Sequence, residues 1–176
     1  QLDDEGKEYM QFCVEAAHRM RQLIQDLLEY SKIGSSDRPF QVIDMQTVVD
    51  NALQDLQLFL EEHQARVTIA RPLPAHVVAE PVMLEQLIQN LIKNGIKFKH
   101  ANRTPEISVA ASETPQHWIF SFTDNGIGID REHQESIFII FRRLHTREEY
   151  EGTGIGLAVA KRIVTHHQGE IWVEIG

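Results

Sequence analysis

Residues 2–33 form the longest uninterrupted pattern in the chain, with no proline and a single glycine, Gly6. Apolar residues recur there at alternating intervals of three and four, at Cys13, Ala16, Met20, Leu23, Leu27 and Tyr30. This spacing predicts a helix with a heptad seam, which Ala17 and Ile24 widen. Because a lone helix would leave the seam in water, we expect it to pack on other helices in a bundle. Docking of the helix on the remainder of this chain is the alternative.

A small, polar segment follows, from Gly34 to Pro39, and proline closes it. We therefore predict a helical unit at residues 1–33, a linker at 34–39 and a separate domain at 40–176. In that domain the patterns predict strands at residues 40–43, 67–70, 76–79, 106–111, 118–123 and 170–175. They predict helices at residues 44–63, 81–99 and 155–167. This order predicts an α/β fold, an α+β two-layer sandwich with helices on one face of a mixed sheet.

Composition limits the classes of partner. The formal net charge of −9 argues against broad binding to nucleic acid or to an anionic membrane. The longest apolar run, residues 137–141, is too short to cross a bilayer, and no signal-peptide pattern opens the chain. A single cysteine, Cys13, fits a reducing compartment. We expect a cytoplasmic protein with no membrane segment in this chain, in which an anionic ligand would need locally concentrated positive groups.

The predicted helix at 81–99 carries a polar stripe opposite its apolar face, formed by Gln86, Asn90, Asn94 and Lys97. Asparagine inside a helix costs about half a kcal/mol against alanine, and Gly95 adds about 1 kcal/mol. Residues that disfavour the helix in this way suggest a ligand. The amide oxygens would face a hard cation, and the lysine would face phosphate. Ordinary solvent-facing polarity is the alternative.

Asp124-Asn125-Gly126-Ile127-Gly128 comes directly after a predicted strand. Two glycines separated by one residue let the backbone turn tightly and approach a ligand closely. The carboxylate at the strand end is then placed to accept a hydrogen bond from an amino group. A plain turn is the alternative, because Asp-Asn-Gly is also typical of turns.

A third segment, Gly152-Thr153-Gly154-Ile155-Gly156-Leu157, opens a predicted helix. Glycine-rich backbone at a helix N-terminus presents unpaired amide groups, which suit phosphate. The segment is not a P-loop, because no lysine followed by Ser or Thr comes after the glycines. It also fails the dinucleotide fingerprint, because Val159 stands where the third glycine belongs. Local positive charge comes from three upstream residues, Arg142, Arg143 and Arg147.

Taken in order, these segments resemble the ATP-binding domain of sensor histidine kinases, a Bergerat-type fold of the gyrase, Hsp90, histidine kinase and MutL superfamily. Residues 90–98 resemble its N box, 124–128 and 152–157 its two glycine boxes, and 137–144 its F box. The helix at 1–33 resembles the second helix of the dimerisation and phosphotransfer hairpin. That helix and residues 144–150 are similar to phytochrome-type and related cyanobacterial and bacterial kinases.

The resemblance implies two cofactors, ATP and Mg2+. It implies that Asn94 ligates the magnesium ion and that Asn90 lines the same site. Lys97 would contact the phosphates, Phe98 the adenine ring, and Asp124 the adenine amino group. The remaining implied ATP-binding residues shape the base pocket, reach the terminal phosphate or bound a mobile lid: Gly126, Gly128, Arg143, Gly152, Thr153, Gly154, Gly156 and Leu157.

The implied activity is transfer of the ATP γ-phosphoryl group to a histidine on the first hairpin helix and then to a response regulator receiver domain. The implied assembly of the intact protein is a homodimer through the hairpin helices. That first helix and a last strand after Gly176 are not in the sequence, so we expect no catalytic residue and no autophosphorylation from this chain alone.

The sequence departs from the family pattern at three places: Gly95 replaces the usual alanine, Ile139-Ile140 replace the usual acidic or polar residue and proline, and Gln168 stands where a glycine is common. Two other functions stay open. One is an ATP-driven clamp of the Hsp90 or MutL type, although such proteins carry a glutamate base where Asn90 stands. The other is a non-enzymatic docking module.

Overall fold

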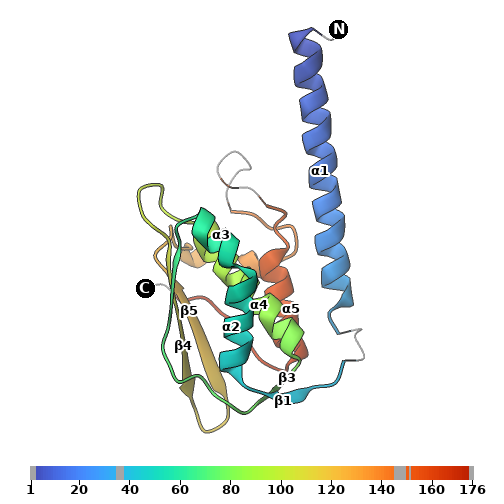
Figure 1. Ribbon diagram of the computed structural model, residues 1–176. Coiled ribbons are helices and arrows are strands. Elements are labelled where there is room, and N and C mark those ends of the chain that lie inside the picture. The colour runs from blue at the N-terminus through green and yellow to red at the C-terminus, as the bar shows by residue number, and fades with distance from the viewer. Residues whose placement is uncertain (1–2, 35–37, 145–149, 151, 175–176) are drawn as a thin grey trace.

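The computed structural model describes residues 3–34, 38–144, 150 and 152–174 of the 176-residue chain. Helix α1 (Asp4–Lys32) begins at Asp3, whose carboxylate accepts a hydrogen bond from the Gly6 N–H at 2.8 Å. Figure 1 shows α1 running alongside the other helices at its C-terminal end and projecting beyond them at its N-terminal end. None of the helices in the described residues is both long enough and apolar enough to cross a bilayer.

Two sheets follow α1. The larger has the strand order β2 (Arg66–Ile69), β4 (Glu106–Glu113), β5 (Trp118–Asp124), with β2 parallel to β4 and β4 antiparallel to β5. The smaller pairs β1 (Gln41–Ile43) with β3 (Val77–Ala79), antiparallel.

The helices lie on one side of the three-stranded sheet (Figure 1), in the two-layer α/β arrangement with a mixed sheet that the sequence predicts. They are α2 (Met45–Asp55), α3 (Gln57–Glu62), α4 (Pro81–Lys97) and α5 (Gly156–His166). Two 3-10 turns, η1 (Arg131–His133) and η2 (Ser136–Phe138), precede α5.

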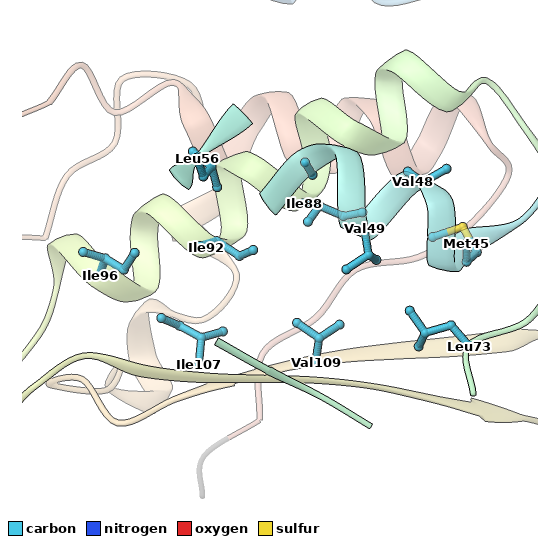
Figure 2. Packing of buried hydrophobic residues seen from close by; sticks show 11 residues of the cluster. Met45, Val48, Val49, Leu56, Leu73, Ile88, Ile92, Ile96, Ile107 and Val109 are labelled. Atoms are coloured by element: carbon cyan, nitrogen blue, oxygen red, sulfur yellow. The ribbon is translucent and has the colours of Figure 1, made fainter. Parts of the chain in front are cut away.

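The main core lies between α4 and β4, and α2 completes it (Figure 2). Ile88, Ile92 and Ile96 follow one another at intervals of four and face the sheet from α4. Ile107 and Val109, two residues apart on β4, point back at them. Residues of α4 two positions further on, where the predicted polar stripe lies, therefore face away from this core.

A second cluster joins α5 to α4 and to the end of α1. It contains Met83, Ile155, Val159, Ile163 and Ile33, and the half-buried Leu23 and Tyr30 of α1 pack against it. The rest of the heptad seam is open, with Met20 58% and Leu27 44% exposed. Within the chain, then, the docking alternative is correct for the last turns of α1, and bundle packing of the open seam stays a prediction.

Two predicted elements differ in the structure. The helix expected at 44–63 is interrupted at Leu56, which lies between α2 and α3 and is buried. Hydrogen bonds from Leu56 N to Ala52 O and from Leu60 N to Leu56 O continue across the interruption, so the distortion is local.

The strand expected at 170–175 is wrong for its described part, 170–174, because these residues pair with no described strand. Ile171 and Val173 are half-buried while Trp172 and Glu174 are exposed, so the alternation is present without a ladder of hydrogen bonds. Residues 175 and 176 lie outside the described residues.

The end of α5 contacts the segment that follows α1. His167 donates from Nδ1 to the Ile163 carbonyl at 2.8 Å and accepts the Glu80 N–H at Nε2 at 3.1 Å. Its ring stacks on Phe40 with centroids 4.8 Å apart. Burial lowers the pKa of His167 below 6.5, outweighing the opposite effect of the Ile163 carbonyl. Both ring nitrogens are used by the neutral tautomer, which ties the start of α4 to the end of α5.

We expect this histidine to make stability depend on pH. Because its folded-state pKa lies below its unfolded value, the stability present above about pH 6.5 is lost as the pH falls toward the folded-state pKa. Urea unfolding at pH 7.5, 6.5 and 5.5 should show this loss in the wild type. The His167→Gln variant should show a smaller loss, from a stability at pH 7.5 about 1 kcal/mol lower.

The control is His117→Gln, which replaces an exposed histidine whose hydrogen bonds to Thr114 are made by its backbone, and it should retain the wild-type dependence on pH. Equal dependence in the wild type and in His167→Gln would contradict the assignment.

Candidate functional site

The polar stripe of α4 carries two asparagines. Asn90 and Asn94 lie one helical turn apart and are half-buried, and no residue in the described part of the chain hydrogen-bonds to either side-chain amide. The Asn94 Nδ2 atom is 3.8 Å from where a β-carbon on Gly156 would lie, so the stripe faces the start of α5. Half-buried amides are normally hydrogen-bonded. Because these two have no partner among the described residues, their oxygens are available to a ligand.

The turn after β5 is clamped from two sides. Asn125 donates from Nδ2 to the Thr104 carbonyl and accepts the Glu106 N–H at Oδ1, both at 3.0 Å. The Ile127 N–H donates to the Phe98 carbonyl at the end of α4, at 2.9 Å. These bonds fix the turn after β5 against the start of β4 on one side and the end of α4 on the other. The sequence indicates Asn125 only as a turn residue, and its clamping contacts reach back about twenty residues, so no local pattern reveals them.

Asp124 is exposed at the end of β5 and is fixed by this turn. Its Oδ1 accepts the Gly126 N–H at 2.9 Å, and no residue in the part of the chain that the structure covers donates to Oδ2. A β-carbon on Gly95 would lie 3.1 Å from the Cβ of Asp124. The departure from alanine at position 95 therefore brings α4 close against the carboxylate.

The glycines of the two segments act in two ways. A β-carbon on Gly126 would lie 2.5 Å from the Phe98 carbonyl oxygen, so a close backbone approach requires glycine there. Gly128, Gly152 and Gly154 instead have positive φ angles of 74°, 136° and 76°. Gly128 has no atom within 4 Å of where its β-carbon would lie, so its conformation alone favours glycine.

We call residues 152–156 the glycine segment; they lead into α5. Ile155, the residue before this helix, makes no side-chain capping bond, and Leu157 is half-buried in the first turn. The Phe141 N–H donates to the Gly154 carbonyl at 3.1 Å and so ties the segment to the loop after η2. An uncapped helix start behind a glycine turn is an arrangement that binds anions.

Two cationic side chains approach the glycine segment. The Nζ of Lys97 lies 2.5 Å from where a β-carbon on Gly152 would be, and 4.5 Å from the centroid of the Phe98 ring. Arg143 donates from Nη1 to the Gly152 carbonyl and from Nη2 to the Tyr150 carbonyl, the latter at 2.6 Å. Lys97 and Arg143 thus place positive charge at Gly152.

Tyr150 adjoins the same region through Phe98. Its ring lies 5.1 Å from the ring of Phe98, between centroids. Helix α4 and the residue after it thus contact both glycine-containing segments: the Phe98 carbonyl lies at Gly126, the Lys97 Nζ at Gly152 and the Asn94 amide near Gly156. Arg147 lies outside the described residues. Two open hollows, one along α2 and α3 and one along α1, join none of Asn94, Asp124 and Gly154.

The chain is similar to proteins of known family. The family described as Histidine kinase-, DNA gyrase B-, and HSP90-like ATPase matches residues 79–176. The phytochrome-like protein Cph1 of Synechocystis sp. is 43% identical over 173 residues, which cover 98% of this chain and 23% of that protein. Cyanobacterial phytochrome A of Nostoc sp. is 45% identical over 174 residues, which cover 99% of this chain and 22% of that protein. The chain thus spans less than a quarter of the length of these curated relatives.

Among solved structures, the crystal structure of full-length ShkA in complex with AMPPNP matches with a TM-score of 0.74. The match covers 100% of this chain and 37% of that one at 22% identity, so this likeness concerns the fold.

Proposed function

The chain belongs to the family of histidine kinase-, DNA gyrase B- and HSP90-like ATPases, and we propose that it binds Mg-ATP as the catalytic part of a sensor histidine kinase. The predicted resemblance to histidine kinases, including phytochromes, is confirmed by the relatives. The proposal extends this family membership to a ligand and a reaction. The nucleotide analogue in the similar ShkA structure supports the choice of ligand.

The observation that carries the proposal is the fixed carboxylate of Asp124. The Gly126 N–H holds Oδ1. No described residue donates to Oδ2, which is therefore available to a donor on a ligand. Adenine offers an amino group at the position where guanine offers a carbonyl, so a fixed carboxylate would favour adenine and reject guanine. Gly126 and Gly128 would allow the backbone to lie close to the base, and Phe98 would contact its ring.

The phosphate end would be served by α4 and the glycine segment. The unpaired amide oxygens of Asn90 and Asn94 are hard ligands of the kind that Mg2+ accepts. Such an ion, when bound, neutralises phosphate charge. Lys97 and Arg143 already lie at Gly152, and we propose that they contact the phosphates there.

The remaining ATP contacts would come from the glycine segment and the start of α5. Thr153, Gly154, Gly156 and Leu157 surround an uncapped helix N-terminus, whose amide groups suit phosphate oxygens. Because Tyr150 and Arg143 lie across this region, we propose that the segment acts as a lid that shifts when nucleotide enters.

In the whole protein, we propose that the γ-phosphoryl group passes to a histidine on a partner helix and then to a response regulator receiver domain. The open seam of α1 supports a helical partner, because Met20, Ile24 and Leu27 are exposed along it. A second copy of the chain, in a homodimer, would bring such helices together. Arrangement in two units, residues 1–33 and 40–176 with a linker at 34–39, belongs to the same proposal.

Thermal unfolding in the presence of nucleotide tests the binding step. A ligand at about ten times its dissociation constant stabilises the folded state by about 1.4 kcal/mol, which raises Tm by about 3–6 °C. We expect this rise with Mg-ATP, a smaller one with ATP and EDTA, and none with Mg-GTP. No rise at millimolar Mg-ATP would leave a docking module as the better account.

Phosphoryl transfer is tested by joining a histidine-bearing helix of a similar kinase to the chain and following labelled ATP. Acid-labile, base-stable phosphate on the protein is the expected product. Steady release of inorganic phosphate without a phosphoprotein would favour a clamp ATPase instead.

A further inference from the structure

Helix α1 holds the glycine segment directly. Thr153 donates from its hydroxyl to the Oδ2 of Asp26, across 127 positions of the sequence, and both residues are half-buried. Asp26 lies on α1 between Leu23 and Tyr30, which pack against the cluster on α5. A carboxylate of the helical unit therefore reaches the segment that leads into α5.

Two further contacts hold the same part of α1 on the domain without touching the glycine segment. Gln86 donates to Glu29 at 3.1 Å, between the first half of α4 and α1. Arg162 of α5 donates to the Ile33 carbonyl at 3.2 Å, and its guanidinium lies 4.5 Å from the centroid of the Tyr30 ring. Docking of α1 is thus shared among several contacts, of which Asp26–Thr153 is the one at the proposed phosphate site.

The charges at this place determine what the contact does. Lys97 and Arg143 approach Gly152, and the Asp26 carboxylate accepts the hydroxyl hydrogen bond of the next residue, Thr153. A terminal phosphate bound among these groups would bring at least one more negative charge close to the Asp26 carboxylate. Like charges a few ångströms apart in a partly buried site repel each other. The bound phosphate would therefore weaken the hold of Asp26 on Thr153, and the docked Asp26 would weaken phosphate binding.

We propose that Asp26 is a positioning residue of the nucleotide site, which holds Thr153 in a docked arrangement that a terminal phosphate disfavours, so that ATP binding and docking of α1 oppose each other. This rests on the proposed function. By linkage, docking of α1 weakens ATP binding by the same factor by which ATP weakens docking, so a signal that holds α1 away from the domain strengthens ATP binding. A signal that moves α1 would in this way reach the nucleotide site through a single hydrogen bond.

The first test compares nucleotides by calorimetry in the presence of Mg2+. Asp26→Asn keeps the shape and an acceptor but removes the charge, and should raise ATP affinity about three- to tenfold while changing ADP affinity less. Glu15→Gln is the matched control, because it removes an exposed α1 carboxylate whose contacts, with Gln11 and Arg19, stay within α1 and so leave docking unchanged. It should leave the ratio of ATP to ADP affinity at the wild-type value.

The second test follows the helix itself. Cys13, the only cysteine of the chain, lies on the heptad seam, so the labelled protein carries Cys13→Ser; His18 on α1 is exposed and off the seam, and Leu58 on α3 is 80% exposed. Spin labels at His18→Cys and at Leu58→Cys should report a longer or broader distance distribution on addition of Mg-AMPPNP than on addition of Mg-ADP. In Asp26→Asn the difference between the two nucleotides should shrink.

The outcomes separate the two proposals. If the wild type and Asp26→Asn bind nucleotide with the same ratio of ATP to ADP affinity, or if the label distance ignores the nucleotide, the inference about Asp26 is overturned and the proposed function stands. If neither protein binds ATP at all, the proposed function is overturned and this inference with it.

Discussion

An Asp124→Asn variant is expected to bind Mg-ATP about 10- to 100-fold more weakly than the wild-type protein. A hydrogen bond to a charged group contributes about 1.5–3 kcal/mol, and the amide replaces an acceptor-only group with one that can also present donors. Because the Gly126 N–H holds one oxygen of the carboxylate, the side chain cannot rotate to present a different atom to the adenine amino group. Calorimetric titration of both proteins with Mg-ATP measures the loss.

Asp130→Asn is the matched control, because it makes the same chemical change six residues further along the same loop. Asp130 is exposed, and its backbone carbonyl accepts the His133 N–H, a bond that the substitution leaves intact. We expect its ATP affinity to stay within twofold of the wild type. ATP affinity unchanged in Asp124→Asn would remove the adenine role from this carboxylate.

The fold could be predicted from the sequence because its signals are local and periodic. Ile88, Ile92 and Ile96 show the buried face of α4 by their spacing alone, and Ile107 and Val109 show that of β4. The order of elements then restricts the layers. Periodicity cannot show whether a segment finds a partner strand. Residues 170–174 alternate as a strand does, yet they pair with no described strand.

Departures from local rules identified the candidate site, whereas its long-range contacts could not be predicted. Asn90, Asn94 and Gly95 are poor helix residues, so the sequence alone indicates a ligand site on α4. The bond between Asp26 and Thr153 joins two residues whose local patterns indicate only a solvated helix position and a loop. Nothing in either neighbourhood of the sequence indicates that they meet.

One departure from the family pattern has a cost that the structure locates. Gln168 replaces a glycine after α5 and has a φ of 59°, in the left-handed region that glycine adopts most easily. The Gly169 N–H still donates to the Val164 carbonyl at 2.9 Å, so the helix ends as it would with glycine. The resemblance alone indicates that Gln168 stands where a glycine is common, but it does not indicate that Gln168 keeps the left-handed conformation.

The backbone contact at Gly126 leads to the second large effect. We expect Gly126→Ala to lower the free energy of unfolding by about 2–3 kcal/mol, because its β-carbon would lie 2.5 Å from the Phe98 carbonyl oxygen and 2.8 Å from the Asp124 Oδ1. Both are held in place, the first at the end of α4 and the second by the turn itself, so neither can yield cheaply. Urea unfolding measures the change.

Gly128→Ala separates crowding from backbone conformation. Its φ is 74°, but no atom lies within 4 Å of the added carbon, so only the left-handed conformation is penalised, by about 1 kcal/mol. Because the collision at Gly126 pushes directly on Asp124, Gly126→Ala should also weaken ATP binding in whatever fraction remains folded, more than Gly128→Ala does. Equal stability losses at the two glycines would mean that α4 and the turn after β5 are not in the close contact that holds the Asp124 carboxylate.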